Sequence, residues 1–109
     1  DLHVLSECRG VQYLWLQGTS IDDTGLAYLA RMDTVMSLAL SDTRVSEQGM
    51  THIAKLPALQ SLYLKRTNIG SNISEAIKHL SKSPSLNHIS VDDAFAGKFR
   101  AGLPHCEVE

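Results

Sequence analysis

Apolar residues recur along the chain at an interval that is too long for the turns of a single helix. The stretch that begins at Val11, V-Q-Y-L-W-L-Q-G-T-S-I, matches the stretch that begins at Val35, V-M-S-L-A-L-S-D-T-R-V, at an offset of 24 along the chain. A third copy with the same apolar positions begins at Leu59. Self-similarity at a fixed period of roughly 20 to 50 residues indicates a stack of repeated structural units. The pattern therefore predicts three consecutive copies of one unit.

After the third copy the interval lengthens by three. Leu62 recurs as Ile89, an offset of 27 instead of 24, and the extra residues fall in the region 70–74. An insertion on the loop side of one copy is either a contact element or neutral drift, and drift is the simpler interpretation. The expected boundaries within one domain, 1–109, are a partial copy at 1–10, complete copies at 11–34, 35–58 and 59–85, and a last strand with a carboxyl-terminal cap at 86–109.

Each copy predicts a short strand, a turn and an amphipathic helix. In the L-x-L segments the two apolar residues face the core and the middle residue faces the other side of the sheet, because side chains alternate along a strand. Leu26, Leu29 and Met32 keep the spacing of one helical face. The strands are expected at 14–16, 38–40, 62–64 and 89–91, and the helices are expected to be capped by Asp22 or Asp23, Ser46, Ser74 and Asp92.

Two details refine these elements. Gly25 and Gly49 fall in the first turn of their helices, where a close approach of the preceding loop would explain the missing side chain. Towards the end of the chain, apolar residues keep helical spacing at positions 95, 99 and 103 and then alternate at 106 and 108. This change of period predicts a capping helix followed by a last short strand.

The full pattern, L-x-x-L-x-L-x-x-T-x-I-x-x-x-G-L-x-x-L-x-x-L, resembles the leucine-rich repeat family. It is most similar to the bacterial 24-residue class, in which a threonine closes the strand, here Thr19, Thr43 and Thr67. The resemblance implies an α/β solenoid of about four repeats plus a carboxyl-terminal cap, with short parallel strands on the concave face and helices on the convex face. The threonine hydroxyls are expected to satisfy backbone groups of their own loop and of the neighbouring loop, in a ladder that ends at Ala94.

Composition narrows the class of function. The 109 residues carry 10 basic and 12 acidic side chains, a formal charge of −2, and the basic residues are scattered. This balance disfavours nucleic-acid binding, and no apolar run reaches the roughly 20 residues that membrane insertion needs. The two cysteines, Cys8 and Cys106, lie at opposite ends of the chain, so neither a disulfide framework nor a structural zinc site is indicated.

The amino end of the sequence matches the helix of a copy and lacks the strand before it. Leu2 and Leu5 align with Leu26 and Leu29 at the same offset of 24. We therefore expect a fragment of a longer protein, whose exposed apolar end promotes weak self-association. The alternative is that residues 1–10 form a short cap.

The strand register places a distinct set of side chains on the concave face. That face is where solenoid proteins usually bind their partners. It is expected to carry Tyr13, Trp15 and Tyr63, which are the chain's single tryptophan and two of its three tyrosines. Trp and Tyr supply much of the energy of protein interfaces. The predicted binding residues are Tyr13, Trp15, Gln17, Tyr63, Lys65 and His88; in the alternative interpretation the rings simply cover the sheet.

The same face carries residue types that occur in catalytic and metal sites. His88, Ser90 and Asp92 have the residue types of a hydrolytic triad, but alternate residues on a strand lie about 6.6 Å apart, well beyond hydrogen-bond reach. His88 and His105 would lie side by side if the last strand paired in register, with Asp92 and Glu107 as nearby oxygen ligands. The simpler interpretation is two solvated histidines.

The sequence therefore predicts a protein that is not an enzyme and needs no cofactor or metal. Its expected function is to bind a protein or peptide through the concave sheet face. The competing hypothesis is a purely structural segment of a larger multidomain protein. A repeat fold of this kind leaves the identity of the ligand open.

Overall fold

The computed structural model describes residues 11–109, apart from the side chain of Ser71, and its centre is a parallel five-stranded sheet. Each strand pairs with the next strand in the sequence, so the spatial order is the chain order. The strands are β1 (Tyr13–Trp15), β2 (Ser37–Ala39), β3 (Ser61–Tyr63), β4 (His88–Ser90) and β5 (Glu107–Val108). Parallel neighbours need a crossover connection, and helical segments supply it.

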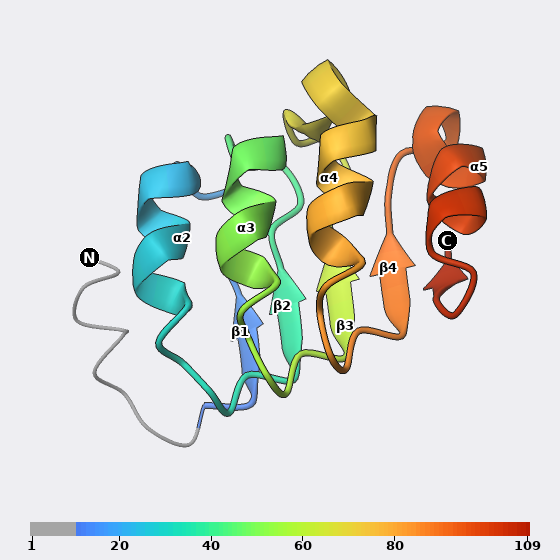
Figure 1. Cartoon of the computed structure of the whole chain (residues 1–109). Helices are drawn as coiled ribbons and strands as arrows, with labels where there is room; N and C mark the ends of the chain where they lie inside the picture. Colours follow the sequence, from blue (N-terminus) through green and yellow to red (C-terminus); the bar gives the residue numbers. More distant parts are fainter. Residues whose placement is uncertain (1–10) are drawn as a thin grey trace.

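The helices cover a single face of the sheet. Figure 1 shows α2, α3 and α4 side by side in one layer, with the strands behind them. The helical elements are α2 (Asp23–Leu29), the 3₁₀ turn η1 (Glu47–Gly49) leading into α3 (Met50–Ile53), the 3₁₀ turn η2 (Ile69–Asn72) leading into α4 (Ile73–Leu80), and α5 (Asp93–Gly102). The chain is thus a small α/β domain whose sheet has one face covered and one face open.

The strand pairing follows the two offsets of the sequence. Leu14 pairs with Leu38 and Leu38 with Leu62, both at the offset of 24, whereas Leu62 pairs with Ile89 at the offset of 27. The leucines of the inner strands are fully buried between sheet and helices. Leu14 is only half-buried, because within residues 11–109 β1 has a neighbouring strand on one side alone.

The helix starts confirm part of the capping prediction. The carboxylate of Asp22 accepts hydrogen bonds from the backbone N–H groups of Thr24 and Gly25, at 3.1 and 3.3 Å, and begins α2. Ser74 is not a cap, because the inserted residues form η2 and leave Asn72 to accept from the N–H of Glu75 at 3.2 Å.

The other two expected caps use their side chains elsewhere. Ser46 precedes η1, and its hydroxyl donates to the carboxylate of Asp23 instead of capping its own turn. Asp92 precedes α5, and its carboxylate accepts from the backbone N–H of Arg66 at 3.0 Å. Both side chains therefore join neighbouring copies of the unit.

The strand-closing threonines bond within their own loops. Thr19, Thr43 and Thr67 each donate to the carbonyl oxygen three residues earlier, at 2.7, 2.5 and 2.9 Å. The expected bonds to the neighbouring loop are not found in the described part of the chain, so that half of the prediction is wrong: the i−3 carbonyl already takes the hydroxyl proton. Ala94 lies in the first turn of α5, and the series ends there as predicted.

Two glycines mark close contacts between copies. A Cβ on Gly49 would lie 2.5 Å from Cδ1 of Leu26, so the close approach predicted there exists, although the partner is α2 and not the preceding loop. A Cβ on Gly70 would lie 2.7 Å from Cζ of Phe95. The three-residue insertion is thus packed against the capping helix.

Several predictions concern residues outside the described range. They are the partial copy or short cap at 1–10, the apolar end formed by Leu2 and Leu5, and the state of Cys8.

Within residues 11–109, no helix combines the length and the apolar content that crossing a bilayer requires.

Candidate functional site

The open face of the sheet carries two rows of side chains that run across the strands. Because the strands pair in register, equivalent residues of successive copies lie next to one another. One row consists of Tyr13, Ser37, Ser61, His88 and Glu107, and the other of Trp15, Ala39, Tyr63 and Ser90. We refer to this surface as the open sheet face.

Trp15 and Tyr63 meet above a small residue. Their strands are separated by β2, which places the two backbones about 9.6 Å apart, twice the spacing of neighbouring strands. The ring centroids are nevertheless only 6.1 Å apart, at an interplanar angle of 40°. The residue between them is Ala39, which is 4% exposed. A larger side chain at Ala39 would hold the rings apart.

The ring contacts continue to His88. Its ring centroid lies 5.9 Å from that of Tyr63, at an angle of 56°. Trp15, Tyr63 and His88 therefore form a continuous line of three rings across β1 to β4, which we call the aromatic row. Ring pairs at centroid distances of about 4.5 to 7 Å attract one another beyond the area they bury, so the row is a pre-ordered surface.

The alternative in which His88 and His105 lie side by side is wrong. Glu107 stands opposite His88, and His105 lies in the exposed turn that joins α5 to β5. The imidazole Nε2 of His88 lies instead 3.0 Å from Oε1 of Glu109. Among the described residues, no three His, Cys, Asp or Glu side chains are grouped so as to hold a metal ion.

A shallow hollow of about 250 Å³ adjoins the aromatic row. Ala39 ends β2, Ser41 lies in the turn that follows it, and Trp15 and Tyr63 lie on the strands on either side of Ala39. Its full lining is Trp15, Gln17, Ala39, Ser41, Asp42, Tyr63 and Arg66. A space of this size takes up one or two side chains of a partner, between an aromatic wall and a charged wall.

The charged wall is an ion pair with two hydrogen bonds. Nε and a terminal nitrogen of Arg66 donate to the two carboxylate oxygens of Asp42, at 2.6 and 2.9 Å. The hydrogen bond from Arg66 lowers the pKa of the Asp42 carboxyl, and the same bond raises the pKa of the guanidinium. The two charges compensate each other, so this wall is polar without a strong net charge.

The sequence interpretation missed this pair. Neither Asp42 nor Arg66 is among the predicted binding residues. One signal was present: positions 18, 42 and 66 are equivalent at the offset of 24 and begin with a glycine. All three residues have positive φ, so the three turns share one left-handed backbone conformation. Because equivalent turns stack on one another, Asp42 lies next to Arg66.

The remaining predicted residues lie around this centre. Gln17 lines the hollow. Tyr13 is 58% exposed and makes no ring contact within residues 11–109. Lys65 is half-buried beyond the row of Trp15 and Tyr63, and it does not line the hollow. The structure therefore brings Trp15, Gln17 and Tyr63 together at the hollow, and His88 through the aromatic row.

Comparisons with known proteins bear on the fold. No protein-family model matches the chain, and no curated protein matches it. A solved structure titled "Leiomodin-1 Actin-Binding Site 2 (ABS2)" is similar, with a TM-score of 0.72 and 20% sequence identity over 94% of this chain. The chain spans 65% of the length of that leiomodin-1 chain. At this level of identity the likeness establishes a shared fold.

Proposed function

We propose that the chain is a leucine-rich-repeat solenoid segment that binds a protein or peptide through its open sheet face and performs no chemistry. The observation that carries the proposal is the aromatic row beside the hollow. Trp15 is 57% exposed, although it is the largest apolar side chain in the sequence. Aromatic side chains that fill a partner's pocket are typical anchors of protein interfaces.

The solenoid interpretation draws on the repeat pattern and on the stacked strands. One strand and one helical segment per copy, added in chain order, are what a solenoid requires. The similar leiomodin-1 structure is titled an actin-binding site, so a chain of this fold class serves protein binding in that case. This supports a protein ligand in general, without naming the ligand of this chain.

The hollow and the rings suit a peptide better than a flat protein surface. The hollow accepts one apolar anchor between the aromatic wall of Trp15 and Tyr63 and the Asp42–Arg66 pair, and this pair offers polar groups to the backbone of the ligand. Pre-ordered rings lose little side-chain freedom on binding.

Selection of peptides from a random display library provides the test. Peptides that bind the 109-residue parent are measured against Trp15→Ala and Tyr63→Ala, with Tyr28→Ala as the matched control on the helix face. Truncation of an aromatic anchor costs about 2 kcal/mol, roughly a thirtyfold loss of affinity. If both open-face variants bind as tightly as the parent, the proposal fails and the purely structural segment becomes the better hypothesis.

A further inference from the structure

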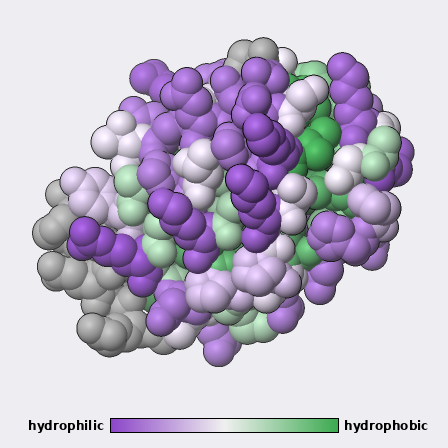
Figure 2. Space-filling model, in the orientation of Figure 1, coloured by the Kyte–Doolittle hydropathy of each residue, from purple (hydrophilic) through white to green (hydrophobic). Residues whose placement is uncertain are grey.

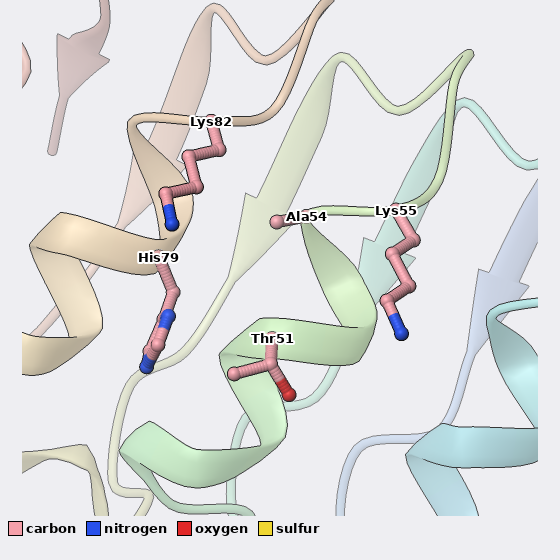
Figure 3. Close-up of a pocket in the computed structure, with 5 residues that line it drawn as sticks. All are labelled: Thr51, Ala54, Lys55, His79 and Lys82. Atoms are coloured by element: carbon pink, nitrogen blue, oxygen red, sulfur yellow. The ribbon is translucent and has the colours of Figure 1, made fainter.

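A second hollow lies on the opposite, helix-covered face, between α3 and α4. Its volume is about 310 Å³, and it is lined by Thr51, Ala54, Lys55, His79 and Lys82. Figure 3 shows His79 and Lys82 on the α4 side and Thr51, Ala54 and Lys55 on the α3 side. Figure 2 shows that hydrophilic side chains dominate this face of the molecule. The hollow is therefore chemically unlike the one on the open sheet face.

Positive charge dominates the lining. Both lysines are exposed, and neither ammonium group has an ion-pair or hydrogen-bond partner within the described range. No carboxylate lines the hollow. The carboxylate of Glu75 contacts the lining from outside, because its Oε2 lies 3.5 Å from Nε2 of His79, one helical turn away. Two full positive charges therefore stand uncompensated at the rim.

The two lysines are part of a regular series. Arg31, Lys55 and Lys82 occupy equivalent positions in successive copies and follow the ends of α2, α3 and α4. A helix end carries only about half an elementary charge, and the four-residue α3 carries less. Lys55 and Lys82 therefore leave an excess of positive charge along this edge, whereas exposed Asp33, two residues after Arg31, offsets part of the charge at the end of α2.

Acidic residues gather at the other ends of the same helices. Asp22 and Asp23 begin α2, Glu47 lies in the turn before α3, and Glu75 lies in the first turn of α4. The helix layer therefore has acidic residues at one edge and basic residues at the other. The positive edge is complementary to a strongly acidic ligand.

We propose that the hollow and its basic edge bind an extended acidic segment of a partner polypeptide, with carboxylates on every third residue. Packed helices lie about 8 to 10 Å apart. In a polyproline II segment, residues three apart face the same side and are about 9.3 Å apart, from a rise of about 3.1 Å per residue. Successive carboxylates therefore reach Lys55 and Lys82, and a third reaches Arg31.

The size and lining of the hollow favour a peptide over a small inorganic anion. Its volume is at the lower end of the roughly 300 to 1,000 Å³ that is typical of organic ligand sites. Ala54, the methyl group of Thr51 and the lysine stems provide apolar surface that phosphate would leave uncovered. An apolar residue between two carboxylates covers that surface.

Fluorescence anisotropy with a labelled peptide of four Glu-Pro-Pro repeats provides the test. The double variant Lys55→Glu, Lys82→Glu is expected to bind at least tenfold more weakly than the parent. The matched control is Arg44→Glu, Lys98→Glu, which changes the net charge equally at exposed residues that do not line the hollow. The control is expected to stay within threefold of the parent.

Three results would overturn the proposal. The first is an equal loss of affinity in the control variant, which would show that the peptide responds only to the net charge of the protein. The second is equally tight binding of a Glu-Pro repeat peptide with the same number of glutamates, which would show that a three-residue spacing of the carboxylates is not required. The third is displacement of the labelled peptide by inorganic phosphate as effectively as by unlabelled peptide. Trp15→Ala is expected to leave this binding unchanged, so the test is independent of the open sheet face.

Discussion

The guanidinium of Arg66 holds the carboxylate of Asp42 across two stacked turns, and both residues have left-handed backbone. Their φ angles are 59° and 60°, and the equivalent first position is Gly18, at 75°. Non-glycine residues adopt this region uncommonly, although Asp and Asn are enriched there. A glycine at either position would remove the backbone strain. The protein therefore keeps the two charged side chains at a cost in backbone conformational energy, and these side chains form a wall of the hollow.

Loss of Arg66 is expected to change the acid response of the protein. In the variant Arg66→Gln, the pKa of the Asp42 carboxyl should rise towards its ordinary value, because the hydrogen bond from Arg66 is the largest cause of its lowering. A lowered folded-state pKa stabilises the fold above the unfolded value of about 3.9, and this contribution disappears as pH falls through the folded-state pKa.

Thermal melts over a pH series measure this effect. The difference in Tm between parent and Arg66→Gln should be present at neutral pH and vanish in strong acid. An NMR titration of the Asp42 carboxyl carbon reports the pKa directly. Superimposable titrations of parent and variant would contradict the ion pair.

The buried leucines should contribute unequally along the stack. Leu40 directly follows β2 and is fully buried, so Leu40→Ala is expected to reduce the free energy of unfolding by about 2 to 5 kcal/mol. Leu16 is the equivalent residue beside β1 and is only half-buried, so Leu16→Ala should cost less. Urea denaturation measures both. A cost below about 1 kcal/mol for Leu40→Ala would contradict the register described here.

Ser83 occupies an apolar position of the repeat. It is 6% exposed, its hydroxyl has no hydrogen-bond partner within residues 11–109, and the equivalent residues in earlier copies are Met32 and Leu56. An unsatisfied buried hydroxyl costs about 1 to 3 kcal/mol, so Ser83→Ala should raise the free energy of unfolding. The control is Ser85→Ala, which removes a hydroxyl that donates to the carbonyl of Pro57 at 2.8 Å and should not stabilise. A destabilised Ser83→Ala protein would show that the hydroxyl has a partner.

The thiol of Cys106 should react slowly in the folded protein. Partial burial raises its pKa, and its Sγ donates to the carbonyl of Leu86 at 3.3 Å. Because the thiolate is the reactive species, alkylation by iodoacetamide at pH 8 should be slower than in urea and should accelerate as pH rises. The variant Cys8→Ser isolates this thiol. Equal rates in folded and unfolded protein would show that Cys106 is freely exposed.

Periodic burial made the sheet predictable from the sequence. Paired residues of neighbouring strands are separated by the same 24 or 27 positions as the repeated apolar residues. The reason is that each leucine is buried beside the equivalent residue of the next copy. The exposure of Trp15 followed from the same alternation.

The repeating signal of the turns is weaker than that of the strands, and several predictions failed there. The length of the turn after Gly102 decides which residue stands opposite His88, and apolar spacing did not fix that length. The cap of α4 is Asn72 and not the predicted Ser74, because apolar spacing does not tell whether inserted residues belong to a helix or precede it. The Asp42–Arg66 pair depends on two turns stacking, which neither turn reveals alone.

Because Trp15 contacts Tyr63 on the open sheet face, intrinsic tryptophan fluorescence reports ligand binding to this face. The chain holds one tryptophan, so intrinsic emission excited at the red edge of the absorption band arises from this ring alone. A ligand that covers the half-exposed indole removes water from it and shifts the emission to shorter wavelength. An acidic peptide on the helix-covered face leaves the indole in water, so one unlabelled titration tells the two surfaces apart.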